Sequence, residues 1–141
     1  MLRRLKVILS LMLVTAGCHD AVGPDVDPGE IQIDFSVTVF SKDQSIIEVK
    51  TEAGSILVDG ILTTSQGGYE LRPALERLRR GVYRFSVEAE SVGPGITIPI
   101  QYRYHAVLHP WPSGRYRLEV VVRDLDARWE LRVFDDEVNV Q

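Results

Sequence analysis

The chain of 141 residues has only one cysteine, Cys18, and only three histidines. A single cysteine cannot form an internal disulfide, and it excludes zinc sites and redox pairs that need two cysteines. The sequence also lacks any run of five or more like charges, because 16 Lys and Arg are spread among 20 Asp and Glu, for a net charge of -4. Binding to nucleic acid requires a basic stretch or patch, so we expect no nucleic-acid partner.

Motifs that carry catalysis are missing as well. The sequence contains neither G-x-S-x-G nor a P-loop. Its most notable carboxylate groups are Glu88 with Glu90 and the run 135–137, but neighbouring residues on one face of a strand point to solvent rather than into one cleft. A calcium site would need six or more oxygens from a loop. We therefore expect no enzyme, no metal site and no cofactor.

No apolar run is long enough to cross a membrane as a helix. The apolar stretch 7–16 is interrupted only by Ser10 and Thr15, and it follows the basic residues Arg3, Arg4 and Lys6. About 20 apolar residues are needed to span a bilayer, so this segment is too short. A positive start followed by a short apolar stretch is typical of an export signal, which we predict over residues 1–17.

The end of that segment resembles the lipobox of bacterial lipoproteins. Residues 14–18 read Val-Thr-Ala-Gly-Cys, with Thr15 where Leu is the commonest residue. In that family a diacylglyceryl group is attached to the thiol and the chain is cut just before the cysteine. The resemblance implies that Cys18 becomes the lipid-bearing first residue. The alternatives are a plain secretory signal that leaves Cys18 as a free thiol, and an uncleaved anchor.

The resemblance also implies a location. N-terminal acyl chains would attach the protein to a membrane of the cell envelope. In the family, Asp directly after the cysteine favours the inner membrane, whereas here His19 follows Cys18, so the outer membrane is expected over the inner membrane. Loss of residues 1–17 would leave 13 basic and 20 acidic residues. We therefore expect the soluble part not to adsorb on anionic lipid.

Residues 18–30 are predicted to form a flexible tether after the lipidated Cys18. The stretch 19–30, HDAVGPDVDPGE, contains three Asp, two Pro and two Gly and has no apolar period. Segments of this composition are typical of solvated linkers. One folded domain is then expected over residues 31–141.

That domain is predicted to be an all-β antiparallel sandwich of seven to eight strands, with a small β-barrel as the alternative. Apolar and polar residues alternate with the period of a half-buried strand, as in Ile33, Phe35 and Val37. A change of parity in the last strand predicts a bulge near Asp135. The candidate strands are 31–39, 45–51, 56–64, 69–77, 83–90, 96–109, 115–123 and 127–140.

The segment 73–80 has two interpretations. Pro73 stands where the first turn of a helix tolerates proline, and Gly81 stands where helices end. Only about two helical turns would fit, however, and so short a helix is marginal unless it is packed. Because Tyr69, Leu71 and Leu75 also fit an incoming hairpin strand, we favour a strand.

Residues 108–120, LHPWPSGRYRLEV, resemble the L-x-P-x-G-x-Y-x-L-x-V hairpin of bacterial immunoglobulin-like and transthyretin-like sandwiches. The resemblance covers about a tenth of the chain. It implies that Gly114 turns the corner and that Tyr116 packs its ring under the loop. It implies a fold, and no activity comes with it.

The candidate binding surface consists of Arg103, His105, His109 and Trp111. Alternation places the first three on the polar face of one strand, and Trp111 lies between two prolines in the loop that follows. His105 and His109 would be about 13 Å apart in an extended strand, which is too far for one metal ion. Trp111 could be an exposed platform that stacks on a sugar or anchors a partner, or it could cap the core.

Two functions follow from these observations. The first is a non-catalytic, lipid-anchored envelope protein that serves as a structural or interaction module for an envelope protein partner. The second is a small-ligand or glycan binder that uses the Trp111 loop. A flat apolar patch or an open sheet edge would favour the first function, and exposed aromatic residues beside Trp111 would favour the second.

Overall fold

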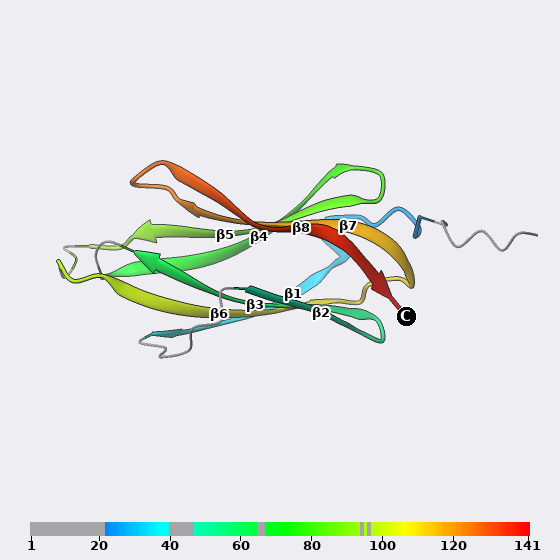
Figure 1. Ribbon diagram of the computed structural model, residues 1–141, viewed down its shortest axis with the longest axis horizontal. Helices are drawn as coiled ribbons and strands as arrows, with labels where there is room; N and C mark the ends of the chain where they lie inside the picture. The colour runs from blue at the N-terminus through cyan, green and yellow to red at the C-terminus, as the bar shows by residue number, and fades with distance from the viewer. Residues whose placement is uncertain (1–21, 40–46, 65–66, 94, 96) are drawn as a thin grey trace, which may run out of the picture.

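A computed structural model describes residues 22–39, 47–64, 67–93, 95 and 97–141. Residues 1–17 and Cys18 lie outside the described residues, so the signal and lipidation predictions are not addressed by the fold. The described residues form two packed four-stranded sheets that do not close into a barrel (Figure 1). This arrangement confirms the predicted all-β sandwich. Within the described residues the elements are η1 (Pro28–Glu30), β1 (Gln32–Val39), β2 (Ile47–Glu52), β3 (Ser55–Thr64), β4 (Tyr69–Arg79), β5 (Val82–Ser91), β6 (Ile100–His109), β7 (Gly114–Asp124) and β8 (Trp129–Val140).

One sheet has the strand order β1-β6-β3-β2 and the other has the order β4-β5-β7-β8. Neighbouring strands are antiparallel, as predicted, except for β5 and β7, which are parallel. The chain crosses after β5 to the other sheet, forms β6 there, and returns as β7. A parallel pair needs a crossover connection, and here the strand β6 supplies it.

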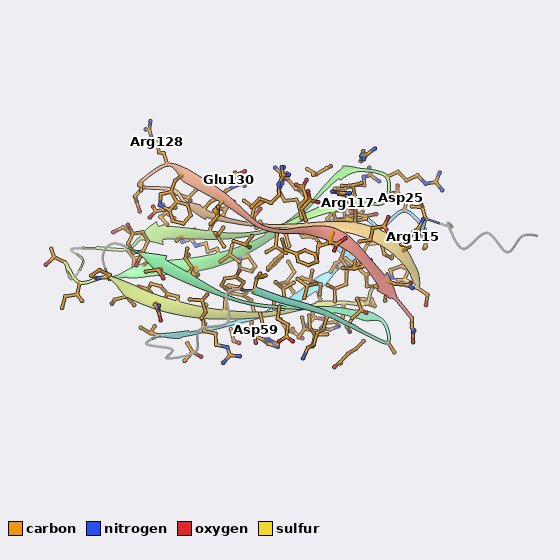
Figure 2. The ribbon with its side chains drawn as sticks, viewed as in Figure 1. Asp25, Asp59, Arg115, Arg117, Arg128 and Glu130 are labelled. Atoms are coloured by element: carbon orange, nitrogen blue, oxygen red, sulfur yellow. The ribbon has the colours of Figure 1, made fainter. Side chains whose placement is uncertain are left out.

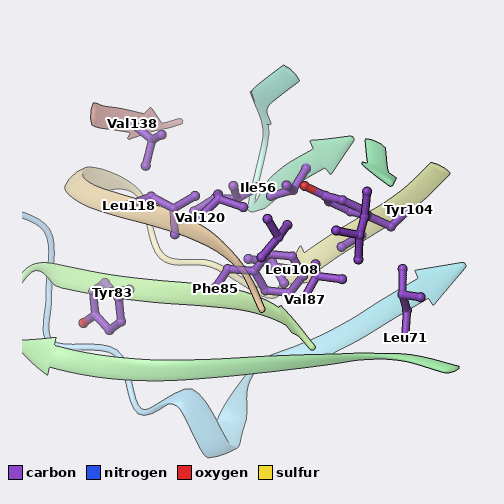
Figure 3. Packing of buried hydrophobic residues seen from close by; sticks show 14 of the residues in the cluster. Ile56, Leu71, Tyr83, Phe85, Val87, Tyr104, Leu108, Leu118, Val120 and Val138 are labelled. Carbon is purple, nitrogen blue, oxygen red and sulfur yellow. The ribbon is translucent and has the colours of Figure 1, made fainter. Parts of the chain in front are cut away.

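The core lies between the two sheets. It is formed by the side chains of each strand that point toward the opposite sheet. Figure 3 shows Phe85 and Val87 of β5 packing with Leu118 and Val120 of β7. The facing sheet contributes residues of β3 and β6, among them Ile56. Each fully buried side chain of this size contributes about 1.5 to 3 kcal/mol relative to an exposed one. The edge strand β1 is covered less, and its inner residues are only half-buried or exposed.

The segment 73–80 is a strand, as we favoured. Pro73 of β4 pairs with Val87 of β5, and no strand of the described residues pairs with the other edge of β4. Proline cannot donate a hydrogen bond to a ladder, but an edge strand has one row of N–H groups without a partner, so it tolerates Pro73. A register shift between Arg77 and Arg79 leaves Leu78 as an extra residue near the turn.

The start of one strand and the position of one bulge differ most from the sequence prediction. The strand predicted from residue 96 begins at Ile100, and Ile98 lies outside it with 61% of its surface exposed. Pro99 has no N–H to donate, which explains why regular pairing starts after it. The bulge in β8 is present but lies two residues earlier than predicted, because Val120 pairs with Phe134 and Val121 with Arg132, which leaves Val133 extra.

The described part of the predicted tether, residues 22–30, packs on the sandwich and is not a free linker. Val26 is only 4% exposed and belongs to the core cluster. Its backbone N–H donates a hydrogen bond of 2.7 Å to the hydroxyl of Tyr83. Asp25 forms an ion pair with Arg77 of β4. The prediction fails here because one buried valine creates no apolar period, although it is enough to attach the segment.

The sandwich has two distinct ends. One end carries segment 22–30, the β2–β3 and β4–β5 turns, the β6–β7 loop and the last residue of the chain (Figure 1). We call it the N-terminal end, after segment 22–30. There Gly54 donates its N–H to the carbonyl of Gln141 at 3.1 Å and accepts from the N–H of Trp111 at 2.7 Å. At the opposite end, the N–H of Val92 donates to the carbonyl of Gly68 at 2.9 Å.

Candidate functional site

Arg103 and His105 lie on the outer face of β6 and meet at one carboxylate, that of Asp59 on β3. Arg103 donates from Nε to Oδ1 at 3.0 Å and from Nη2 to Oδ2 at 2.9 Å, a bidentate pair. The Nδ1 atom of His105 lies 3.9 Å from Oδ2. The hydrogen bonds from Arg103 lower the pKa of Asp59 below its ordinary value of 3.8. The guanidinium is therefore held in one orientation by its partner strand.

Sequence reasoning missed Asp59. Asp59 is 44 residues away from Arg103 in the chain, and only the pairing of β3 with β6 places the two side by side. A depression of about 100 Å³ lies beside Asp59 and His105, and its other walls come from Glu48, Lys50 and Leu57. Its polar groups are mostly in ion pairs, and a shallow surface of this kind lacks the enclosed apolar walls of a typical ligand pocket.

His109 belongs to a different contact. Its Nε2 atom lies 2.7 Å from Oδ2 of Asp34 on the neighbouring strand β1. The hydrogen bond from His109 is the main cause that lowers the pKa of Asp34. His105 and His109 thus face two separate carboxylates. Within the part of the chain that the structure describes, no three His, Cys, Asp or Glu side chains come together as metal ligands.

Trp111 is not part of the same surface. Only 2% of its surface is exposed, and its ring packs into the core at the N-terminal end. The indole meets Tyr83 at 5.2 Å and Tyr116 at 5.7 Å between ring centroids, with interplanar angles of 85° and 84°. Edge-to-face pairs of this kind stabilise by about 0.5 to 1.5 kcal/mol beyond their buried area. Trp111 therefore caps the core, and the exposed-platform interpretation is wrong.

Gly114 and Tyr116 hold the loop that carries Trp111. Gly114 has a φ of 149°, and a Cβ on it would lie 2.4 Å from the Cα of Gly23, so the position requires glycine. The hydroxyl of Tyr116 donates a hydrogen bond of 2.7 Å to the carbonyl of Pro112. The glycine at the corner and the tyrosine ring beneath the loop are the local roles that the hairpin resemblance implied.

A pocket of about 260 Å³ lies beside the buried indole. The loop contributes Pro110 and Pro112, and the N-terminal segment contributes the other wall. The sequence could not predict this pocket, because three of its seven lining residues, Asp25, Val26 and Glu30, lie in the segment predicted to be a tether. The lining residues are Asp25, Val26, Glu30, Ile31, Pro110, Trp111 and Pro112.

Comparison of the chain with protein-family models, with curated proteins and with solved structures found no match. Among the described residues there is also no helix long and apolar enough to cross a membrane. The structure by itself therefore places the chain among two-sheet β-sandwiches and in no narrower family.

Proposed function

We propose that this protein is a non-catalytic lipoprotein of the cell envelope, attached through acyl chains on Cys18 and serving as a structural or interaction module. The observation that carries the proposal is the position of Cys18. It follows a basic and apolar leader and ends the lipobox-like sequence Val14 to Cys18, and the described fold begins four residues later at Val22. All described core residues lie at position 26 or later, so cleavage before Cys18 would remove none of them.

The arrangement of polar side chains supports a non-catalytic role. The predicted surface residues contact carboxylates on the outer face of a sheet: Arg103 forms an ion pair with Asp59, and His109 forms a hydrogen bond with Asp34. Catalysis needs groups that converge on a substrate in a cleft. An immunoglobulin-like or transthyretin-like sandwich remains our proposal for the fold family, supported by the hairpin at Gly114 and Tyr116. With His19 after the cysteine, we propose the outer membrane over the inner membrane.

The lipid anchor is tested by expressing the full chain with its leader in a bacterial host. Intact mass should show a chain that begins at Cys18 and carries acyl groups, and the protein should partition into detergent. Cys18→Ser should abolish both properties. Thr15→Leu, which restores the commonest lipobox residue, is the matched control and should retain both. A wild-type chain with an unmodified Cys18 would refute the proposal.

The second candidate function is binding of a small ligand or glycan in the pocket beside Trp111. It is favoured by one observation: Trp111 lines the pocket, and its indole Nε1 is buried without a hydrogen-bond partner among the described residues. A glycan array and a screen of small ligands would test it. Ile31→Arg should abolish binding because it fills the pocket without altering the buried ring, and Arg128→Gln at the opposite end should not. Absence of any captured ligand would eliminate this candidate.

A further inference from the structure

Four arginines gather at the N-terminal end of the sandwich. Arg79 and Arg80 lie at the turn between β4 and β5, and Arg115 and Arg117 lie at the start of β7. We call these four residues the arginine cluster. They line one depression of about 250 Å³, together with Val22, Gly81, Val82, Tyr116 and Glu137. Figure 2 shows Arg115 and Arg117 at the end of the molecule where segment 22–30 lies.

The cluster is divided into paired and unpaired members. Arg117 forms an ion pair with Asp135 at 2.8 Å, and Arg115 lies 3.9 Å from Glu137. Arg79 and Arg80 are exposed, and no carboxylate of the described residues lies within ion-pair distance of either. The turn therefore carries two positive charges that the fold leaves uncompensated. The net negative charge of the chain led us to expect no adsorption on anionic lipid, but it does not reveal this local excess of positive charge.

The described part of the N-terminal segment begins at this cluster. Val22 pairs with Arg115 as an isolated β-bridge, and Gly23 donates its N–H to the carbonyl of Arg115 at 3.0 Å. A Cβ on Gly81 would lie 2.5 Å from the side chain of Val22, so the segment also touches the β4–β5 turn. From Val22 back to Cys18 there are four residue steps, which reach at most about 14 Å.

We propose that the arginine cluster rests on the anionic phosphate headgroups of the bilayer that holds the acyl chains of Cys18, with Arg79 and Arg80 making the contacts. This inference rests on the proposed lipidation. A lipid on Cys18 keeps Val22 within about 14 Å of the bilayer, so the tether is short enough to let the two uncompensated charges approach the surface. The surface potential decays over about 8 Å in physiological salt, so it acts on them once they rest on the headgroups. Guanidinium groups bind phosphate oxygens with two parallel hydrogen bonds.

The contact defines which end of the domain faces outward. Each basic residue near an anionic surface favours the bound orientation by about fivefold, so Arg79 and Arg80 together bias the domain strongly. The opposite end would then point away from the membrane. That end carries the exposed apolar side chains of Val92 and Leu125. An envelope partner could reach them there without competing with lipid.

The test uses the full lipidated protein in vesicles of phosphatidylcholine alone or mixed with phosphatidylglycerol. Because the thiol of Cys18 is blocked by lipid, Ser113→Cys at the N-terminal end and Ala127→Cys at the opposite end each provide one thiol for a fluorescent donor. Energy transfer to headgroup-labelled acceptor lipid then reports which end lies near the surface. On mixed vesicles we expect transfer from position 113 to exceed transfer from position 127 by more than it does on vesicles of phosphatidylcholine alone. High salt should remove this excess, because it screens the charges and leaves the lipid tether intact.

Substitutions connect this orientation to the arginines. Arg79→Gln and Arg80→Gln should each lower the ratio of surface-bound to free orientations by about fivefold, and the double variant should match the behaviour on neutral vesicles. Arg128→Gln, which removes the same charge at the opposite end, should have no effect. If the protein floats with the vesicles but its energy transfer does not change with anionic lipid, with salt or with substitution of either arginine, the headgroup contact is refuted and the lipid anchor is not. Protein that does not float with vesicles overturns the lipid anchor and this inference with it.

Discussion

At the scale of single residues, the buried aromatic cluster of Tyr83, Trp111 and Tyr116 defines the N-terminal end of the core. The three rings form edge-to-face pairs with one another, and the Tyr83 and Tyr116 centroids lie 6.0 Å apart. Tyr83 also accepts the hydrogen bond from Val26, so the cluster joins β5, the β6–β7 loop and the N-terminal segment. Trp111 is thus a structural residue, although its position between two prolines suggested a binding loop.

Trp111→Ala should lower the free energy of unfolding by about 3 to 5 kcal/mol, the usual cost of removing a large buried aromatic side chain. Chemical denaturation measures the effect. Trp129→Ala is the matched control, because that indole is partly exposed on the edge strand β8, and it should cost clearly less. A Trp111→Ala protein as stable as the wild type would show that the ring does not cap the core.

Two buried tyrosines should respond in opposite ways to loss of the hydroxyl. The hydroxyl of Tyr104 is buried against Gly60 and has no hydrogen-bond partner among the described residues, and burial raises its pKa well above the ordinary value. Tyr104→Phe should leave the free energy of unfolding unchanged or raise it by up to about 1 kcal/mol. Tyr116→Phe loses the bond to Pro112 and should lower it by about 1 kcal/mol. A marked loss of stability in Tyr104→Phe would reveal a partner for that hydroxyl.

At the scale of elements, segment 22–30 is the part of the fold whose role differs most from expectation. Its residues are polar or small except for two valines, yet η1 is capped by the Asp27 side chain, which accepts from the N–H of Gly29 at 2.9 Å. Val26 adds the contact that attaches the segment to the core. The folded unit therefore begins at or before Val22.

Removal of residues 22–30 should consequently lower the free energy of unfolding of the sandwich, even though the eight described strands remain.

Val26→Ala should lower the free energy of unfolding by about 2 kcal/mol, because it removes buried apolar surface. Val92→Ala, at an exposed valine, should change the free energy of unfolding by no more than about 0.5 kcal/mol. Thermal and chemical melts of these variants decide the point. Equal stability of chains that begin at Val22 and at Ile31 would restore the tether interpretation.

At the scale of the whole molecule, ion pairs cover the outer faces of both sheets. On the second sheet, Arg84 contacts Glu119 at 3.0 Å, and Arg123 contacts Glu88 at 3.4 Å. These two pairs are partly buried, whereas exposed pairs such as Lys50 with Glu48 contribute little individually. Three aspartates nevertheless have a pKa below the ordinary value of 3.8, because hydrogen bonds from a basic neighbour favour their charged form: Asp34, Asp59 and Asp135.

The lowered pKa values predict sensitivity to acid. A carboxyl group whose pKa is lower in the folded than in the unfolded chain stabilises the fold above the unfolded value, and this stabilisation is lost as the pH falls through the folded value. The free energy of unfolding should thus fall between about pH 5 and pH 2. Asp59→Asn should be less stable than the wild type at neutral pH, and the difference should disappear in acid. Glu52→Gln, which removes a carboxylate without an ion pair among the described residues, should behave like the wild type at each pH.

The sequence predicts much of the fold because the alternation of side chains in a strand is a local property. The period of two in β1 and β5 requires only that neighbouring residues point to opposite faces. By contrast, Pro73 is tolerated because β4 lies at a sheet edge, and Gly114 is required because Gly23 lies against it, and both reasons depend on the tertiary structure. The start of β6 was placed too early because alternation continues through Ile98, and only the missing N–H of Pro99 ends it.

The site was predicted less well, since its contacts join distant parts of the chain. Arg103 and His105 were correctly placed on a polar face, but Asp59, which orients Arg103, is brought there by the pairing of β3 with β6. Trp111 had two interpretations that the sequence left open. The burial of the Trp111 indole depends on which residues of the N-terminal segment and of the two sheets pack against it. The local sequence around Trp111 contains no information on these contacts.

The sequence by itself determined the alternating pattern and therefore the class of fold, and it places Cys18 directly after a short apolar stretch that follows basic residues. Only the tertiary structure decided that Val26 enters the core, that Trp111 faces inward, and that Arg79 and Arg80 lie beside Val22, where the described chain begins. The physical reason is the range of the interactions. Strand periodicity acts between neighbours, whereas the bond from Val26 to Tyr83 spans 57 residues and exists only once the sheets have packed.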